Sequence, residues 1–155
     1  MWRVRALCRE KGCSFCPRQA RREKVRRPMT TMLIVDDDTQ IRMYLRALLR
    51  DNDYAVIEAV DGHEGLRLMR EATTPYIVLL DYMMPNFNGF DVLRAVHADQ
   101  GLFVRHAVII MTAHGPILPI ELARFMTEAD IPLLRKPFDF DEVLEVVAEA
   151  ERKLL

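Results

Sequence analysis

The sequence has no apolar run long enough to cross a membrane as a helix. Such a helix needs about 20 consecutive apolar residues. The longest runs here are shorter, because Asp81 interrupts one of them and prolines break others. The first residues also lack the apolar stretch of a secretory signal. We therefore expect a protein that is neither exported nor inserted in a membrane, with a cytoplasmic location.

Long polar tracts and Pro/Gly/Ser-rich tracts are also missing, which argues against bulk disorder. Half of the 155 residues are hydrophobic and 29% are charged, the balance of an ordinary globular protein. A chain of this length can bury a core that needs no disulfide or structural metal. One folded domain is the expectation.

Cysteine is scarce: the three thiols, Cys8, Cys13 and Cys16, all lie near the start of the chain. Three thiolates could hold zinc only with a fourth ligand, and the nearest histidine, His63, belongs to a different, folded part of the chain. Zinc binding is therefore the minor alternative for this segment.

The basic charge is concentrated at the same end. Residues 1–28 hold ten Arg and Lys against two Glu, a net charge of +8, and the remainder of the chain carries −9. Such a segment buries too little apolar surface to offset the entropy of ordering it. We predict a disordered extension over 1–31 and a folded domain over 32–155. Translation from Met29 or Met32 is an alternative, and a salt-sensitive nucleic-acid tether is another.

From residue 32 onward, strand-like runs alternate with helical patterns. The predicted strands are 32–36, 54–60, 76–81, 106–112 and 131–136. Helical spacing or capping residues predict helices over 39–51, 61–72, 90–99 and 120–129 and from 140 onward. This alternation predicts an α/β fold, a parallel sheet with helices on both faces.

Polar side chains gather where these strands end. Asp36, Asp81, Thr112 and Lys136 each stand at or just after the last residue of a strand. The carboxyl ends of parallel strands share one edge, where α/β proteins bind ligands. We therefore expect the four side chains to meet there.

This set of residues suits one kind of chemistry. Asp36, Asp37 and Asp81 would repel one another unless a cation lay between them, and Mg²⁺ prefers such hard oxygen ligands. The Lys136 ammonium and the Thr112 hydroxyl could hold the oxygens of a phosphoryl group, with Asp81 as the nucleophile.

Four motifs, in order, resemble the response-regulator receiver domain of two-component signalling. They are VDDD (35–38), LLDYMMPNFNG (79–89), IIMTAH (109–114) and RKPF (135–138). The resemblance implies a flavodoxin-like, doubly wound (βα)5 fold with five parallel strands in the order 2-1-3-4-5. It also implies a single-domain regulator that switches protein contacts and is not an enzyme on external substrates.

Site roles follow from the same resemblance. Asp81 would be the phosphoacceptor, and Asp36, Asp37, Asp81 and the Met83 carbonyl would hold Mg²⁺. Thr112 and Lys136 would contact the phosphoryl group, and the bond before Pro137 would be cis.

The resemblance also implies partners. A histidine kinase or phosphotransfer protein would donate the phosphoryl group, and a downstream protein would bind the face of helix 120–129, strand 131–136 and the last helix. One departure is Leu133, where the family often has Tyr or Phe. This keeps a phosphorylation-independent scaffold open as an alternative.

A magnesium phosphohydrolase is disfavoured, because such enzymes commonly place a second Asp two residues after the nucleophile and here that residue is Met83.

Simpler roles suit several other polar residues. Asp38 fits a helix N-terminus, His114 could modulate water access, and His63, His97 and His106 suit surface or structural positions.

Overall fold

The computed structural model describes residues 30–113 and 118–154. The predictions for the basic extension, its three cysteines and His114 lie outside these residues, apart from the last two positions of the extension, Thr30 and Thr31.

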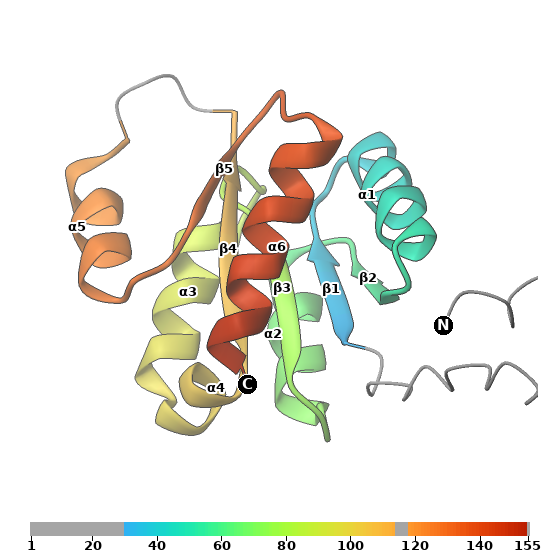
Figure 1. The fold of residues 1–155 in the computed structure, drawn as a ribbon. Coiled ribbons are helices and arrows are strands. Elements are labelled where there is room, and N and C mark those ends of the chain that lie inside the picture. The colour runs from blue at the N-terminus through green and yellow to red at the C-terminus, as the bar shows by residue number, and fades with distance from the viewer. Residues whose placement is uncertain (1–29, 114–117, 155) are drawn as a thin grey trace, which may run out of the picture.

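A five-stranded parallel sheet forms the centre of the domain (Figure 1). Its strands are β1 (Thr31–Val35), β2 (Ala55–Ala59), β3 (Tyr76–Asp81), β4 (Ala107–Thr112) and β5 (Leu133–Arg135). They lie in the order β2-β1-β3-β4-β5, so the predicted topology is confirmed. β5 is three residues long, shorter than the run over 131–136 suggested.

Helices cover both faces of the sheet, but the prediction of one helix after each strand is wrong in one crossover. The helices are α1 (Thr39–Asp51), α2 (Gly62–Glu71), α3 (Gly89–Ala98), α4 (Gln100–Arg105), α5 (Ile120–Glu128) and α6 (Phe140–Leu154). Both α3 and α4 lie between β3 and β4. Asp99 explains the break, because it ends α3 and its carboxylate accepts hydrogen bonds from the backbone of Gly101 and Leu102.

Alternate residues of the central strands point into two separate cores. In β1, Leu33 and Val35 face α2 and α3, whereas Met32 and Ile34 face α1 and α6. β3 and β4 repeat this alternation, as the period of two in a strand requires. Figure 1 shows α1 and α6 together on one side of the sheet. Within the described ranges, no helix is long and apolar enough to cross a bilayer.

Side-chain caps fix where the helices begin. The Asp38 carboxylate accepts from the backbone of Gln40 and Ile41 at the start of α1, which is the helix-terminal role expected for it. At α2, the Asp61 carboxylate accepts from the Glu64 amide at 2.8 Å and is the N-cap of the helix. Asp61 and Glu64 have the spacing of a capping box, in which the Glu64 carboxylate would accept from the Asp61 amide. It accepts from the Val60 amide instead.

His106 ties three elements together at the end of the sheet where β3 and β4 begin. It is buried, its Nδ1 accepts from the Tyr76 amide at 3.1 Å, and its Nε2 lies 3.1 Å from the Met69 carbonyl. An acceptor at Nδ1 requires the proton to sit on Nε2, which donates to Met69. The structural role expected for His106 is therefore the one observed.

The neutral ring of His106 makes the stability of the domain sensitive to mild acid. Burial lowers its pKa below the usual 6.5, against the raising effect of the Met69 hydrogen bond. Unfolded chains take up the proton near pH 6.5 while the folded state resists it, so this contribution to stability is complete above pH 6.5 and is lost as pH falls toward the folded pKa.

We expect His106→Gln to lower the free energy of unfolding at pH 7.5 by about 1–3 kcal/mol, the effect of disrupting a buried polar pair. The variant should also lose less stability than the parent between pH 7 and pH 5, because Gln does not titrate. Urea titrations at several pH values measure both effects. Exposed His63→Gln is the control, and equal pH slopes for the parent and His106→Gln would contradict the assignment.

Candidate functional site

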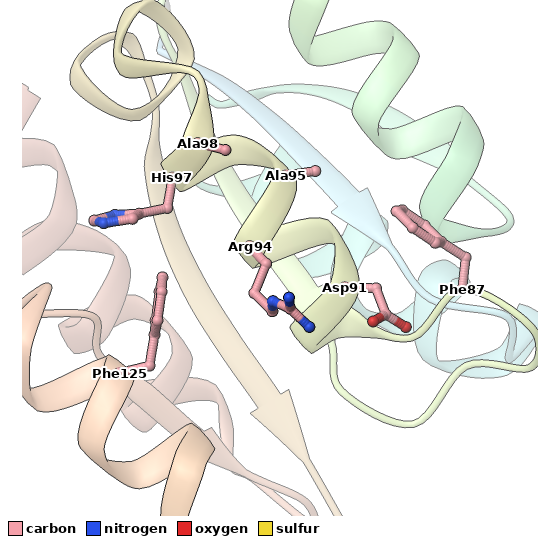
Figure 2. Close-up of a pocket in the computed structure, with 7 residues that line it drawn as sticks. All are labelled: Phe87, Asp91, Arg94, Ala95, His97, Ala98 and Phe125. Carbon is pink, nitrogen blue, oxygen red and sulfur yellow. The ribbon is translucent and has the colours of Figure 1, made fainter.

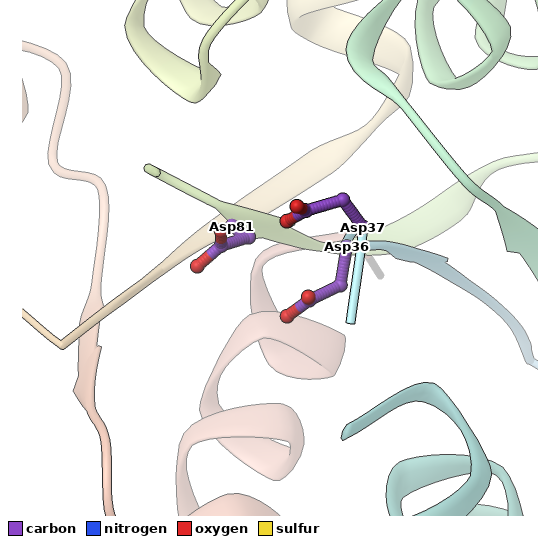
Figure 3. Close-up of side chains that lie close together, drawn as sticks. All are labelled: Asp36, Asp37 and Asp81. Carbon is purple, nitrogen blue, oxygen red and sulfur yellow. The ribbon is translucent and has the colours of Figure 1, made fainter. Parts of the chain in front are cut away.

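Three carboxylates gather where β1 and β3 end. Asp36 follows the last residue of β1, Asp81 is the last residue of β3, and the two strands are neighbours in the sheet. Together with Asp37, each offers a carboxylate oxygen, and these oxygens lie within 4.8 Å of one another. Figure 3 shows the three carboxylates turned to the same side of the sheet edge. Asp36 and Asp81 are buried, and Asp37 is exposed.

Lys136 reaches this cluster from the end of β5. Its Nζ lies 2.7 Å from Asp36 Oδ2 and 2.8 Å from Asp81 Oδ1. The ammonium therefore bridges residues that are 100 and 55 positions away along the chain. One positive charge against three negative charges leaves the pocket with a net negative charge.

Burial sets the electrostatics of the two bridged groups. Burial raises the pKa of the Asp81 carboxyl above 3.8; Lys136 opposes this rise, and Asp36 and Asp37 add to it. For Lys136, burial alone would lower the ammonium pKa, but hydrogen bonds and charge from Asp36 and Asp81 raise it above 10.5. Lys136 thus stays charged. Its single positive charge does not offset the effect of burial and of the neighbouring carboxylates on Asp81.

The backbone after Asp81 turns tightly around the carboxylate. The Met83 amide donates to Asp81 Oδ2 at 3.1 Å, and the Gly89 amide closes the loop on the Tyr82 carbonyl at 3.1 Å. A Cβ at Gly89 would stand 2.3 Å from the Asp81 carbonyl oxygen, so a residue without a side chain is required there. The role of the Met83 carbonyl as a metal ligand stays a prediction.

Thr112 and Lys136 come from adjacent strands at the same edge. Thr112 is fully buried, one residue beyond the β4 partner of Asp81, and its carbonyl accepts from the Lys136 amide at 2.8 Å. The Lys136–Pro137 bond is cis, as predicted. Leu133 is half-buried against the core on the α2 and α3 side of the sheet.

Sequence reasoning missed Arg42, which contacts the backbone of the acidic cluster at Asp36. This arginine is buried in α1, and its Nη1 donates to the Asp36 carbonyl at 2.8 Å. A detectable signal existed, since Arg42 directly follows Ile41 and precedes Leu45 by three positions on the apolar stripe of the helix. A charged residue at that position needs a buried partner.

A separate groove of about 490 Å³ lies between α3 and α5 (Figure 2). It is lined by Phe87, Asp91, Arg94, Ala95, His97, Ala98 and Phe125. Its charged groups already have partners: the Asp91 carboxylate accepts from the Asn88 amide, and the Arg94 guanidinium lies 5.9 Å from the Phe90 ring centre. None of the predicted site residues lines it.

Comparisons with known proteins agree with this geometry. Residues 32–148 match the model of the response regulator receiver domain. The chain is 34% identical over 116 residues to the transcriptional regulatory protein CpxR of Escherichia coli K12, covering 75% of this chain and 47% of CpxR. It is 31% identical over 117 residues to sporulation initiation phosphotransferase F of Bacillus subtilis, covering 75% and 89%.

A solved structure is similar as well. The response regulator TrrA of Thermotoga maritima, in complex with Mg²⁺ and BeF, superposes with a TM-score of 0.66 at 27% identity, covering 79% of this chain and 99% of that one.

The doubly wound sheet and its acidic edge define a phosphoryl-receiving class of α/β domain. This chain belongs to the response regulator receiver domain family, whose members are the phosphoaspartate-based receivers of two-component signalling. The chain spans about half the length of CpxR, the first of the curated relatives it matches.

Proposed function

We propose that this protein receives a phosphoryl group on Asp81 in a magnesium-dependent reaction and thereby changes its contacts with a partner protein. The observation that carries the proposal is the convergence of three carboxylates and Lys136 at one sheet edge. Family membership supports the phosphoaspartate chemistry.

The residues present suit Mg²⁺. Asp36, Asp37 and Asp81 provide hard oxygen donors close together, with too little positive charge among them. With the Met83 carbonyl, they would hold an ion that supplies positive charge to the oxygens of the incoming phosphoryl group. TrrA, the similar structure, was solved with Mg²⁺ and a BeF group.

The chain's own groups then have defined tasks. An Asp81 carboxylate oxygen attacks phosphorus, and the phosphorus–nitrogen bond of a phosphohistidine breaks as the imidazole leaves with a proton. Lys136, already within hydrogen-bond distance of Asp81, stabilises the transferred group, and Thr112 offers its hydroxyl from the next strand. Turnover is limited to this phosphate, so we propose a switch and not an enzyme acting on external substrates.

Donor, partner and location complete the proposal. Receiver domains interact with histidine kinases or phosphotransfer proteins, and we propose such a donor in the cytoplasm. We propose residues 32–155 as the receiver, residues 1–31 as an extension, and the face of α5, β5 and α6 as the downstream binding surface. Leu133 on β5 would report activation without an aromatic ring.

The test is incubation of the full chain with acetyl phosphate, with Mg²⁺ or with EDTA, followed by intact mass. We expect one phosphate per chain with Mg²⁺ and at least about tenfold less without it, because the acidic cluster repels the donor unless a cation neutralises it. Borohydride trapping and peptide mapping should place the adduct at Asp81. No adduct with acetyl phosphate or a phosphorylated kinase would favour a phosphorylation-independent scaffold.

A further inference from the structure

Arg42 makes a hydrogen bond or ion pair with each of its three guanidinium nitrogens. Nη1 donates to the Asp36 carbonyl at 2.8 Å, and Nη2 donates to Thr39 Oγ1 at 3.2 Å. Nε lies 3.5 Å from Glu58 Oε2 on β2. A planar guanidinium with three such contacts has little freedom to turn, so it fixes the position of the Asp36 carbonyl.

That carbonyl belongs to the peptide that joins Asp36 to Asp37. Asp36 itself is held on both carboxylate oxygens, because Oδ1 accepts from the Asp38 amide and Oδ2 from Lys136. Asp37 is different: within residues 30–113 and 118–154, no hydrogen bond or ion pair holds its exposed carboxylate. The direction of Asp37 therefore depends on its backbone, and Arg42 holds the peptide just before it.

We propose that Arg42 is a positioning residue for the magnesium site, acting on Asp37 through the Asp36–Asp37 peptide. The inference rests on the proposed function, since it assumes that the acidic cluster binds Mg²⁺. Partners that orient metal ligands typically change metal affinity by about 10–100-fold when they are removed.

Charge and position predict opposite results for Arg42, which makes the proposal testable. Arg42 carries a positive charge near the cluster, and removing it should by charge alone strengthen Mg²⁺ binding. Loss of positioning should weaken the binding. The carboxylate of Glu58 faces Arg42 at 3.5 Å and partly cancels its charge, so the positional effect should dominate.

Arg46 provides a matched control. It is on the same helix, is also an arginine, and pairs with the same Glu58 at 2.8 Å. Within the described ranges, none of its hydrogen bonds or ion pairs involves the backbone of Asp36. Arg46→Met thus also removes one positive charge and one ion pair with Glu58. It leaves the hydrogen bond of Arg42 to the Asp36–Asp37 peptide in place.

The experiment is calorimetric titration of Mg²⁺ into the full chain, with the Mg²⁺ dependence of acetyl phosphate labelling as a second readout. For Arg42→Met we expect about a tenfold higher Kd. The half-maximal Mg²⁺ for labelling should rise equally, and the maximal rate should recover at saturating Mg²⁺. A purely structural defect would lower the amplitude at every Mg²⁺ concentration. Arg46→Met should stay within about twofold of the parent, because it leaves the Asp36 carbonyl bound.

Arg42→Lys keeps the positive charge but replaces the planar guanidinium by a single ammonium. This variant replaces Arg42→Met in the experiment if Arg42→Met does not fold. Its Kd should also rise, because one ammonium cannot make three directed contacts. An unchanged or lower Kd in Arg42→Met or Arg42→Lys would overturn the proposal, as would equal weakening in Arg46→Met. Failure of the parent chain to bind Mg²⁺ would instead overturn the proposed function.

Discussion

Asp81→Asn is expected to abolish phosphate uptake from acetyl phosphate and, in magnesium-free buffer at neutral pH, to raise the unfolding midpoint. Uptake is lost because an amide oxygen is a poor nucleophile, and we expect a drop of at least about 100-fold. The gain in stability has a separate cause. Burial raises the pKa of Asp81, so the charged carboxylate is less favourable in the folded protein than in the unfolded chain.

The sign follows from proton linkage. A folded-state pKa above 3.8 means that the folded protein keeps a proton which the unfolded chain has lost. The free energy of unfolding therefore falls as pH rises from 3.8 through the folded pKa, and the loss persists at neutral pH. Asn at position 81 does not titrate and should remove this contribution. Lys136 keeps its contact with Asp36 in the variant.

Intact mass after acetyl phosphate treatment and thermal unfolding with EDTA measure the two effects. Asp51→Asn is the matched control, because Asp51 is an exposed carboxylate at the end of α1, away from the sheet edge. It should take up phosphate like the parent and melt at nearly the same temperature. Uptake of phosphate by Asp81→Asn would show that another residue is the phosphoacceptor. A lower unfolding midpoint for this variant would contradict the electrostatic argument.

The parallel strands and the gathering of acids at one edge could be anticipated from local signals, whereas the strand order was implied by the resemblance of the four motifs. Apolar runs ended by Asp36 and Asp81 mark strand ends, and parallel topology brings such ends together. Lys136 could be placed by the same logic, although it lies 100 residues from Asp36. The motifs added the roles, which sequence periodicity does not supply.

Other features depend on contacts that periodicity does not encode. Asp99 both ends one helix and begins the next. The helix predicted over 90–99 stops there, so α4 was missed. Glu64 had the spacing of a capping box, yet its carboxylate binds the Val60 amide. Arg42 required knowledge of which carbonyl faces α1, and that carbonyl is 6 residues away.

Lys136→Met is expected to have the opposite effect on stability from Asp81→Asn, although both changes remove a charge from one pocket. The substitution leaves Asp36 and Asp81, with side chains 1% and 4% exposed, without their shared cation. Removing one partner of a buried ion pair typically lowers stability by about 3–5 kcal/mol. Because the carboxylates raise the pKa of Lys136 above 10.5, its contribution is complete at neutral pH and is lost only as pH rises through the folded pKa.

Urea denaturation with EDTA at pH 7 measures this loss, and Lys153→Met is the control. Lys153 pairs with Asp130 at 2.8 Å on the surface, where that carboxylate is 87% exposed, so its removal should lower stability by less than about 1 kcal/mol. A loss as small in Lys136→Met would contradict the electrostatic account of the pocket.

The double variant Lys136→Met/Asp81→Asn separates charge from packing. If uncompensated negative charge causes the loss, Asp81→Asn should raise stability more in the Lys136→Met background than in the parent, because it then neutralises a buried carboxylate that has lost its cation. Added Mg²⁺ should likewise narrow the gap between Lys136→Met and the parent, since a divalent cation supplies the missing charge. An equal effect of Asp81→Asn in both backgrounds would show that the methylene chain of Lys136, and not its ammonium, supports the pocket. The sign of the coupling between positions 81 and 136 thus decides whether electrostatics governs this site.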